Sequence, residues 1–459
     1  MIGNVDGIDN DYIAGWAMEP DDETYRVPLD VFYNGALFTQ TIASYHRDDL
    51  ARAHVGDGSN GFYVAMPALA NPEHAEVEVR VQRSGERVGE IQQIARRPKC
   101  SAHGVLAADM LRLQPFPLHS IQSVAFDGDR LLVQGIHLPP YGNPFVLRVR
   151  SSPGTVFDVT YPQHVRNVGD WYWYWPNGSW CGFRIDIDLA ASTDDRPFFE
   201  FYFEYDGSDE SSTALGRNRI WIPKDIGAFQ TFPHGDQLTR VQRFDHPRRV
   251  ALSGYTDYRR MRLIAEEYGV DLPAANVLDW GCGHGRVVRH FAREHAVTQA
   301  WGVDIDAENV GWLAENLPGI HASAVPLLPP SDLPSSHFDF VYAISVMTHL
   351  THDMQEAWLA EIKRIAKPGA IIALTFAGPA SVAFASKFLT PAYVQTWQST
   401  GFDDSLPSED LVDKIADADY YRNTKQSAQY TRELWGRYFE VIDIHPCAFG
   451  YQDIAILRA

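Results

Sequence analysis

The spacing of apolar and polar residues along the chain changes character near residue 250. Before that point, short runs of alternating apolar and polar residues are separated by turn residues such as Asn34-Gly35 and Ser84-Gly85. Strand-length runs with turn signals about every ten residues are typical of all-β sandwiches, and Asn-Gly between two such runs indicates a hairpin. We expect strands over residues 28–32, 75–82, 130–135, 145–149 and 198–205.

This strand-rich region divides into two parts, residues 1–98 and 118–228, joined by a linker around 95–117. Each part contains a turn, a strand, a glycine, a further strand and a Gly-Phe pair, which is Gly61-Phe62 in the first part and Gly182-Phe183 in the second. A shared order of this kind favours a degenerate internal repeat. We therefore predict two β-sandwich-like units before the pattern changes.

After residue 250 the pattern alternates between strands and helices. Apolar residues at helical spacing over 353–367 are followed by Pro368-Gly369, which stops a helix. This alternation predicts a doubly wound, mostly parallel sheet over residues 236–459, a Rossmann-like α/β domain. The expected strands are 276–280, 300–304, 338–344 and 370–376, the expected helices are 286–294, 307–316 and 353–367, and the expected antiparallel edge hairpin joins 438–444 to 452–457.

Composition narrows the classes of function. The 459 residues carry 39 Lys and Arg against 59 Asp and Glu, a net charge of −20. No nucleic-acid partner is expected, because phosphate binding needs a basic face. No apolar run approaches the roughly 18 to 20 residues of a membrane span, and residues 1–6 lack the basic and apolar regions of a secretory signal. The four cysteines lie far apart, so we expect a cytoplasmic protein with reduced thiols.

The stretch VLDWGCGHGR, which ends at Arg286, holds the strongest chemical signal. A buried strand reaches Asp279, and the turn formed by Gly281, Gly283 and Gly285 then opens a helix, where a ligand can lie against the backbone. A dinucleotide fingerprint would need a small residue where Arg286 stands. Asp279 would also repel a pyrophosphate, so this loop suits a cationic ligand better.

This motif and the features after it resemble the signatures of class I S-adenosylmethionine-dependent methyltransferases. Gly302-Val303-Asp304 places a carboxylate at the end of the second strand, 338–345 looks like the fourth strand, and 367–370 looks like the turn before the fifth. The resemblance implies S-adenosylmethionine as cofactor, with Asp304 on the ribose hydroxyls. The cofactor-binding residues that it implies are Asp279, Gly281, Cys282, Gly283, Gly285, Asp304, Ile305, Ser345 and Tyr255.

Two details of the resemblance concern the ends of the cofactor. Tyr255 belongs to a helical segment, 253–258, that lies where the family has a helix closing over the cofactor. Family members often carry an acid after the third strand that binds adenine, whereas residues 321–325 contain none. The adenine contact is therefore left unassigned.

Finer features resemble a subgroup of this family. Residues 345–350, Pro329-Pro330 and Gln452-Asp453 look like methyltransferases found beside glycosyltransferases in surface-polysaccharide gene sets. Roughly the first 67 residues look like a β-sandwich domain fused to bacterial glycosyltransferases. The resemblance implies O-methylation of a saccharide or glycan precursor, and a homo-oligomer or an association with glycan-synthesis enzymes would fit. Two alternatives stay open: a small metabolite or lipid-linked acceptor, and a non-catalytic carbohydrate-binding protein with a vestigial methyltransferase fold.

A hydroxyl acceptor must lose a proton, which favours a base with a pKa near neutrality. His349 follows the fourth strand at the edge where open α/β folds bind ligands, so we interpret it as the general base. The alternative is that His349 caps the next helix or packs against it. A metal site at His349 and His352-Asp353 is not expected, because the sequence shows no further clustered ligand.

Two aromatic-rich segments remain. The insertion 378–436 is expected to form a lid over the acceptor. Residues 171–175 read Trp-Tyr-Trp-Tyr-Trp; as a strand, they would place tryptophans on one face and tyrosines on the other. One face would then be a sugar-stacking platform or an interface, unless a neighbouring domain covers it. The candidate substrate contacts are Tyr421, Tyr430 and Gln452.

Overall fold

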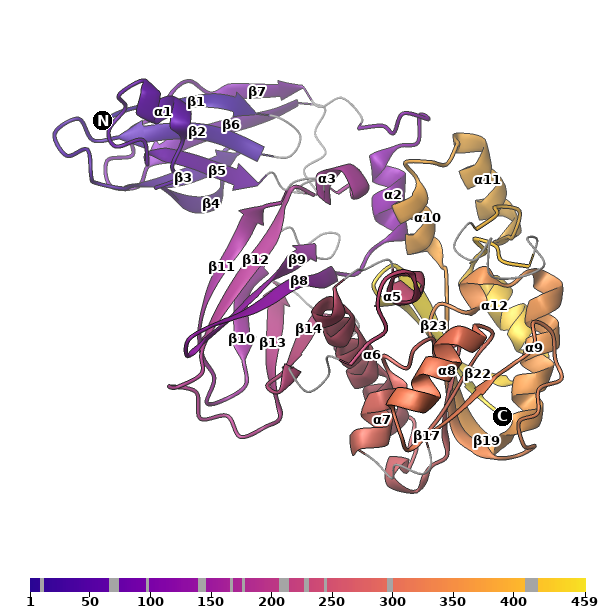
Figure 1. The fold of residues 1–459 in the computed structure, drawn as a ribbon. Coiled ribbons are helices and arrows are strands. Elements are labelled where there is room, and N and C mark those ends of the chain that lie inside the picture. The colour runs from indigo at the N-terminus through magenta and orange to yellow at the C-terminus, as the bar shows by residue number, and fades with distance from the viewer. Residues whose placement is uncertain are drawn as a thin grey trace. The chain divides into compact units, whose positions relative to one another are not determined.

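The computed structural model describes the chain as two compact units, each with its own sheets (Figure 1). The first unit comprises Met1–Ser101, Leu106–Ala108 and His164–Cys181, and the second comprises Ala102–Val105, Asp109–Gln163 and Gly182–Ala459. The residues described are 1–8, 12–65, 74–95, 99–138, 146–165, 168–175, 178–205, 214–226, 231–242, 246–294, 300–408 and 420–459. Every helix within these ranges is too short or too polar to traverse a bilayer.

The first unit contains two antiparallel sheets. One has the strand order β1 (Ile2–Ile8), β2 (Tyr12–Met18), β5 (Gly61–Ala65). The other has the order β4 (Ala36–Ala43), β3 (Val27–Tyr33), β6 (His74–Val81), β7 (Gln92–Ala95). A short helix, α1 (Asp48–Arg52), precedes β5. Side chains of both sheets form one buried apolar cluster, which includes Val5, Val31, Phe62 and Val79.

The predicted hairpin at Asn34-Gly35 is confirmed. β3 and β4 pair antiparallel, beginning with Tyr33 opposite Ala36. Asn34 has φ 48° and Gly35 has φ 78°. Two successive positive φ values define the type I′ turn of two-residue hairpins, which Asn-Gly adopts readily because Asn tolerates this region and glycine has no Cβ.

The second unit begins with another pair of antiparallel sheets, preceded by α2 (Ala107–Leu113). The four-stranded sheet has the order β11 (Val156–His164), β12 (Trp180–Asp188), β9 (Arg130–Leu138), β8 (Leu118–Asp127). The three-stranded sheet has the order β10 (Val146–Ser151), β13 (Phe198–Tyr205), β14 (Arg219–Pro223). Both sheets bury side chains in one cluster, which includes Val133, Ile185, Phe201 and Ile222.

The two strand-rich parts share the pairing of six strands and differ in one, because β4 pairs with β3 whereas β11 pairs with β12. The order β1-β2-β5 corresponds to β8-β9-β12, and β3-β6-β7 corresponds to β10-β13-β14. A Cβ atom added to Gly15 would overlap the ring of Phe62, and one added to Gly135 would overlap the ring of Phe183. The same glycine therefore makes room for the same phenylalanine in both copies, which supports the repeat.

The expectation of a strand over residues 171–175 is wrong. The chain forms a short helix, α3 (Val168–Trp171), and then turns, with Tyr172 N–H donating to the Val168 carbonyl and Trp175 N–H to the Tyr172 carbonyl. These local hydrogen bonds replace a strand ladder, so the alternation of faces is lost. Tyr174 and Trp175 are buried, whereas Trp171 is exposed, and no two-faced aromatic platform forms here.

The predicted α/β sheet is confirmed in the second unit. Its seven strands have the order β17 (Ile320–Ala324), β16 (Ala300–Asp304), β15 (Val277–Trp280), β18 (Phe338–Ala343), β19 (Ala366–Phe376), β23 (Gln452–Arg458), β22 (Glu440–Phe449). The first five strands are parallel, and β23 runs antiparallel to both of its neighbours. Strand order reverses between β15 and β18, which is where such sheets bind ligands.

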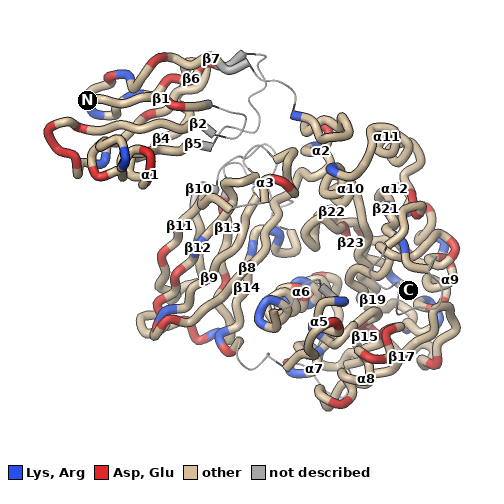
Figure 2. The backbone as a smooth tube through the Cα atoms, turned by 45° about the horizontal axis from the view of Figure 1, so that its top comes forward, with Lys and Arg blue, Asp and Glu red and all other residues tan. Residues whose placement is uncertain are grey.

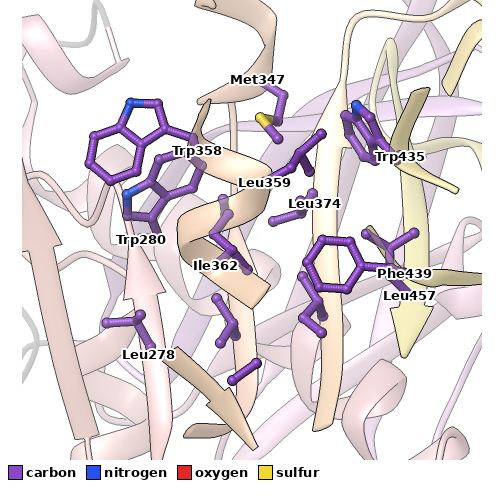
Figure 3. Packing of buried hydrophobic residues seen from close by; sticks show 14 of the residues in the cluster. Leu278, Trp280, Met347, Trp358, Leu359, Ile362, Leu374, Trp435, Phe439 and Leu457 are labelled. Atoms are coloured by element: carbon purple, nitrogen blue, oxygen red, sulfur yellow. The ribbon is translucent and has the colours of Figure 1, made fainter. Parts of the chain in front are cut away.

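Helices cover both faces of this sheet. Along β18, Val341 belongs to an apolar cluster with α9 (His352–Ile365) and α12 (Ala428–Trp435), whereas Tyr342 belongs to one with α6 (Pro247–Glu267) and α7 (Val288–Glu294). Figure 3 shows the first cluster, where Trp280 lies 5.0 Å from Trp358 between ring centroids. The remaining helices are α5 (Asp236–Gln242), α8 (Ala307–Asn316), α10 (Pro379–Ala385) and α11 (Pro391–Thr400).

Helix α9 ends at Ile365, before the predicted stop at Pro368-Gly369. Ala366 already has extended backbone, with φ −73° and ψ 141°. The rule that the residue before proline avoids helical conformation applies to Lys367, so the helix breaks one residue earlier than the proline requires. The strand then continues from Ala366 into β19.

Helix α6 connects the strand-rich part of the second unit to the α/β sheet. Lys and Arg residues gather along it (Figure 2). Arg248 donates to the Val124 carbonyl at 2.9 Å, and the Arg260 guanidinium lies 3.1 Å from His119 Nε2. Leu252 is buried in the cluster between the two preceding sheets. The strand-rich part and the α/β sheet therefore share a helix and a continuous interior.

Candidate functional site

The turn after β15 forms the head of the site. Gly281 has φ 80°, and a Cβ added there would overlap a methyl group of Val346, so only glycine fits. The N–H groups of Gly281 and Cys282 donate to the Val303 carbonyl at 2.8 and 3.0 Å. Gly283 N–H donates to a carboxylate at the end of the neighbouring strand. The turn is thus held against β16 at the switch point of the sheet.

Two carboxylates flank this turn. Asp279 is 3% exposed, and burial raises its pKa from 3.8 to about 7, while Tyr342 and the charge of Arg286 lower it and the charge of Asp304 raises it further. Burial also raises the pKa of Asp304, whose oxygens accept N–H groups of Gly283 at 2.7 Å and Asp306 at 2.9 Å. A buried acid and a half-buried acid at neighbouring strand ends gain most from a cationic or hydroxyl-bearing ligand.

The other side chains of the turn pack in the interior. Cys282 is buried with Val288 and Leu313, and burial raises its thiol pKa well above the ordinary value, so it is not a reactive thiolate. His284 is fully buried, and burial lowers its pKa to about 3, which keeps the ring neutral. Its ring faces the Phe232 ring edge-on at 5.3 Å.

Helix α5 covers the outside of the turn, a contact that the sequence did not predict. Val241 lies against the Cα of Gly283. Arg240 is ion-paired with Asp306 at 3.3 Å and with Glu308 at 2.7 Å. Asp306 also caps α8, as its position predicts, by accepting the Glu308 N–H at 3.1 Å. In the sequence, Asp306 indicated only a helix cap. Nothing in the sequence pointed to its ion pair with Arg240 on α5.

Ser345 and Gln452 meet at the ends of β18 and β23. Gln452 Nε2 donates to Ser345 Oγ at 2.8 Å, and Ser345 N–H donates to Thr375 Oγ1 at 2.8 Å. Ser345 has φ 62°, a left-handed conformation that a non-glycine residue keeps only where its surroundings hold it. Because β23 is antiparallel, its first residue lies at the same edge as the last residues of the parallel strands. Ile305, next to Asp304, packs half-buried against the main core.

His349 is brought together with Tyr421. Its ring stacks on the Tyr421 ring at 4.0 Å between centroids and 10° between planes. His349 Nδ1 lies 2.8 Å from the Arg422 carbonyl, so the proton is assigned to Nδ1 and Nε2 is an acceptor. The cap of α9 is Thr351, whose Oγ1 accepts the Met354 N–H. The capping alternative for His349 is therefore wrong, and its ring is half-buried.

Tyr430 lies apart from that pair. Its hydroxyl is hydrogen-bonded to His352 Nδ1, and its ring stacks on Phe402 at 4.3 Å. His352 is also 3.8 Å from Glu356. Across the described ranges, no three His, Cys, Asp or Glu side chains are grouped to hold a metal ion.

The structure does not bring Tyr255 to the other candidates. It is 2% exposed, in the core beneath α6, with its ring 5.2 Å from His290 and 6.3 Å from Phe198. Helix α6 touches the turn through Gly254 instead, because a Cβ added there would overlap the Arg286 carbonyl. Tyr255 packs and does not face the turn: in an amphipathic helix, the large apolar side chain turns to the core.

The insertion crosses the carboxyl ends of two strands. Thr424 N–H donates to the Thr348 carbonyl at 2.8 Å, and Gln426 N–H to the Ala377 carbonyl at 2.9 Å. β20 (Phe402–Asp403) and β21 (Lys425–Gln426) pair there, between α11 and α12. The insertion thus lies next to His349, while residues 409–419 fall outside the described ranges.

A comparison with protein families identifies one domain. Residues 277–369 match the family model described as a methyltransferase domain. A search of curated proteins finds no match. Among solved structures, an S-adenosylmethionine-dependent methyltransferase from Mesorhizobium loti is 12% identical, with TM-score 0.32, over 43% of this chain and 98% of that one.

Two further solved structures are similar at the same level. An S-adenosylmethionine-dependent methyltransferase from Methanosarcina mazei is 16% identical over 42% of this chain and 96% of that one, with TM-score 0.31. Magnesium protoporphyrin IX methyltransferase from Synechocystis PCC 6803 is 19% identical over 46% of this chain and 84% of that one, with TM-score 0.30. Scores this low do not define a substrate.

Proposed function

We propose that the chain is a methyltransferase that transfers a methyl group from S-adenosylmethionine to a hydroxyl group of a saccharide or glycan precursor. The observation that carries the methyl-transfer part is the buried Asp279 and the half-buried Asp304 beside the glycine turn, within the region that matches a methyltransferase domain. The saccharide rests on association, namely the resemblance of the finer motifs and of the N-terminal strands.

The residues present fit this cofactor. S-adenosylmethionine supplies an electrophilic methyl group on a positively charged sulfur. Asp279 is a buried acid whose charge costs free energy until a cation lies nearby, and Asp304 offers two acceptor oxygens to a vicinal diol. The glycines from Gly281 to Gly285 let the backbone turn tightly, and the side chains of Val346, Val241 and Leu313 pack where their Cβ atoms would lie. Cys282, Ile305 and Ser345 would border the same ligand.

The acceptor side consists of His349, Tyr421 and Gln452. His349 Nε2 would take the proton of the acceptor hydroxyl, because its Nδ1 proton faces the Arg422 carbonyl. Tyr421 holds the imidazole plane by stacking. Gln452 would orient the acceptor through the amide that now donates to Ser345, and Tyr430 would contact a larger acceptor from α12. Holding both reactants in line can lower the barrier by roughly 7 to 11 kcal/mol.

The proposed domains are residues 1–98, 118–228 and a methyltransferase domain at 236–459, of which the last two belong largely to one compact unit. In each part, one cluster of side chains joins two sheets, as in a β-sandwich. A cytoplasmic enzyme fits the buried thiols of Cys181, Cys282 and Cys447. A homo-oligomer, or an assembly with glycan-synthesis enzymes, is its expected context.

The test is transfer of labelled methyl from S-adenosylmethionine to a panel of nucleotide sugars, oligosaccharides, small metabolites and lipid-linked acceptors. Label on a sugar hydroxyl supports the proposal, and label on non-sugar acceptors alone would replace the saccharide with one of the other acceptors. Titration calorimetry separates the remaining alternative, because a vestigial domain would give no heat with S-adenosylmethionine.

The role of His349 is tested by His349→Ala, with His321→Ala on the exposed edge strand β17 as the matched control. His349→Ala should lower turnover by roughly 10²- to 10⁴-fold, the usual contribution of a general base, with cofactor affinity unchanged. Full turnover in this variant would remove the role.

A further inference from the structure

The terminal hairpin carries a bulge beside the proposed acceptor site. β22 and β23 pair at His445 opposite Ile454, and again at Phe449 opposite Gln452. Between these pairs, three residues of β22 oppose the single residue Asp453. A bulge bends its strand and re-aims the neighbouring side chains, and bulges gather next to active sites. Here the neighbouring side chain is Gln452.

Within the bulge, the backbone N–H of Cys447 and the carbonyl of Pro446 find hydrogen-bond partners outside the strand ladder. Cys447 is buried at φ 54°, and its N–H donates to Asp453 Oδ1 at 2.9 Å. The carbonyl of Pro446 accepts Arg217 Nε at 2.9 Å. Buried donors and acceptors of the main chain require partners. One partner comes from the hairpin itself, and the other comes from a residue more than 200 positions earlier.

Arg217 is fixed by the strand-rich part of the second unit, not by the α/β sheet. It is 3% exposed, at the entry to β14, and its guanidinium carbon lies 4.3 Å from the centroid of the Phe116 ring. The turn before it, η1 (Ala214–Gly216), has left-handed residues at Leu215 and Gly216. The next residue, Asn218, donates to the Phe203 carbonyl at 3.1 Å. The strand-rich part therefore determines where the guanidinium lies.

The bulge in turn touches the site through Asp453 and Gln452. The Asp453 carboxylate lies directly against Gly378, the residue that precedes α10. Gln452 Nε2 donates to Ser345 Oγ at 2.8 Å, where Ser345 holds its left-handed conformation at the end of β18. A continuous set of contacts thus runs from Arg217, through the bulge, to the edge where the acceptor would bind.

We propose that Arg217 is a positioning residue for methyl transfer: by holding the Pro446 carbonyl, it keeps the bulge formed and Gln452 directed at Ser345. This inference rests on the proposed function, and it makes the second strand-rich part a working piece of the enzyme. Ser345 would also border the cofactor, but Thr375 Oγ1 accepts its backbone N–H independently of Gln452, so the loss of Arg217 should change acceptor turnover and leave cofactor affinity nearly unaltered.

The experiment compares Arg217→Lys with Arg219→Lys, which alters the same strand but an arginine that pairs with Glu200 instead of the hairpin. Hydrogen exchange of the full-length protein, without any ligand, should accelerate over residues 445–453 in Arg217→Lys only. With the acceptor found by labelling, kcat should fall tenfold or more in this variant, because small displacements at a reacting centre carry penalties of that size. Affinity for S-adenosylmethionine should stay within twofold of the wild type.

A double mutant distinguishes positioning from general destabilisation. If Arg217 acts through Gln452, the pair Arg217→Lys and Gln452→Ala should have the kcat of Gln452→Ala alone. Additive losses, or unchanged exchange at the hairpin in Arg217→Lys, would overturn the inference. Absence of S-adenosylmethionine binding in the wild type would instead remove the proposed function, and the ligand-free exchange result would still show whether Arg217 holds the bulge.

Discussion

The pH dependence of cofactor binding tests the buried acid at the head of the sheet. Burial raises the pKa of Asp279 to about 7. At pH 6, about one molecule in ten therefore carries the carboxylate that a cationic ligand needs, and at pH 8 about nine in ten do. Binding that requires this charge is expected to be about tenfold weaker at pH 6 than at pH 8, with release of a proton at the lower pH.

The raised pKa of Asp279 also makes the stability of the ligand-free protein depend on pH. Between pH 3.8 and about 7, folded Asp279 keeps a proton that the unfolded chain has lost. Its contribution to stability therefore falls as pH rises, by about 1.4 kcal/mol per unit and about 4 kcal/mol in all. Asp279→Asn removes this dependence, so the ligand-free variant should be more stable than the wild type at pH 8 and should bind S-adenosylmethionine weakly at every pH.

The assay is titration calorimetry between pH 6 and 8, in buffers of different ionisation enthalpy. Glu361→Gln is the matched control, because Arg364 and burial act on Glu361 in opposite senses and leave its pKa at about 2, far from this range. The amino group of the ligand titrates equally with every variant and cancels in the comparison. An Asp279→Asn variant with wild-type affinity and wild-type pH slope would refute the reasoning.

Three further predictions concern the fold. Gly135→Ala should destabilise the protein by about 1 to 3 kcal/mol in thermal unfolding, because its methyl group would overlap both the Phe183 ring and the Ser120 carbonyl oxygen. Phe183→Leu in the same chain should recover only the part of the loss that comes from the ring, because the backbone contact remains. Trp358→Ala should cost about 3 to 5 kcal/mol in chemical denaturation, because it empties the space beside the core residues of Figure 3. Glu361→Gln should lower the free energy of unfolding at pH 7, because Arg364 lowers the pKa of Glu361 and so stabilises its ionised form in the folded protein. The difference from the wild type should disappear as pH falls toward 2. Acid unfolding followed by circular dichroism would measure it.

Local patterns predicted the elements whose causes are local. The Asn34-Gly35 hairpin and the alternation of strands and helices after residue 250 follow from turn chemistry and side-chain period, and the structure confirms both. The strand prediction for residues 171–175 was wrong because the local pattern did not determine the structure there. Alternating bulky aromatics satisfy the strand pattern, but nothing in five residues records that the chain turns back through hydrogen bonds to Val168.

In the candidate site, too, the sequence predicted the residues that are placed by local structure and missed those that are placed by tertiary contacts. The glycine turn and Asp304 are set by strand ends, so the sequence could place them at one sheet edge. Tyr255 was predicted to bind the cofactor because its segment lies where the family has a helix. In the structure, this side of α6 faces the core. Helix α5 over the turn and Arg217 under the hairpin depend on tertiary contacts across long stretches of chain. No spacing in the sequence encodes those contacts.

Asp279 in β15 and Asp453 in β23 are two buried acids in the same sheet. Burial raises the pKa of each acid to about 7, so burial alone does not distinguish them. Asp453 has its compensation built in, because the Cys447 N–H and the nearby Arg217 charge both favour its ionised form. At Asp279, Tyr342, the Arg286 charge and the Val288 backbone lower the pKa, and the Asp304 charge raises it. The two sites therefore differ in the second acid: a cation that binds beside Asp279 also offsets its repulsion with Asp304, which is what a sulfonium donor would supply.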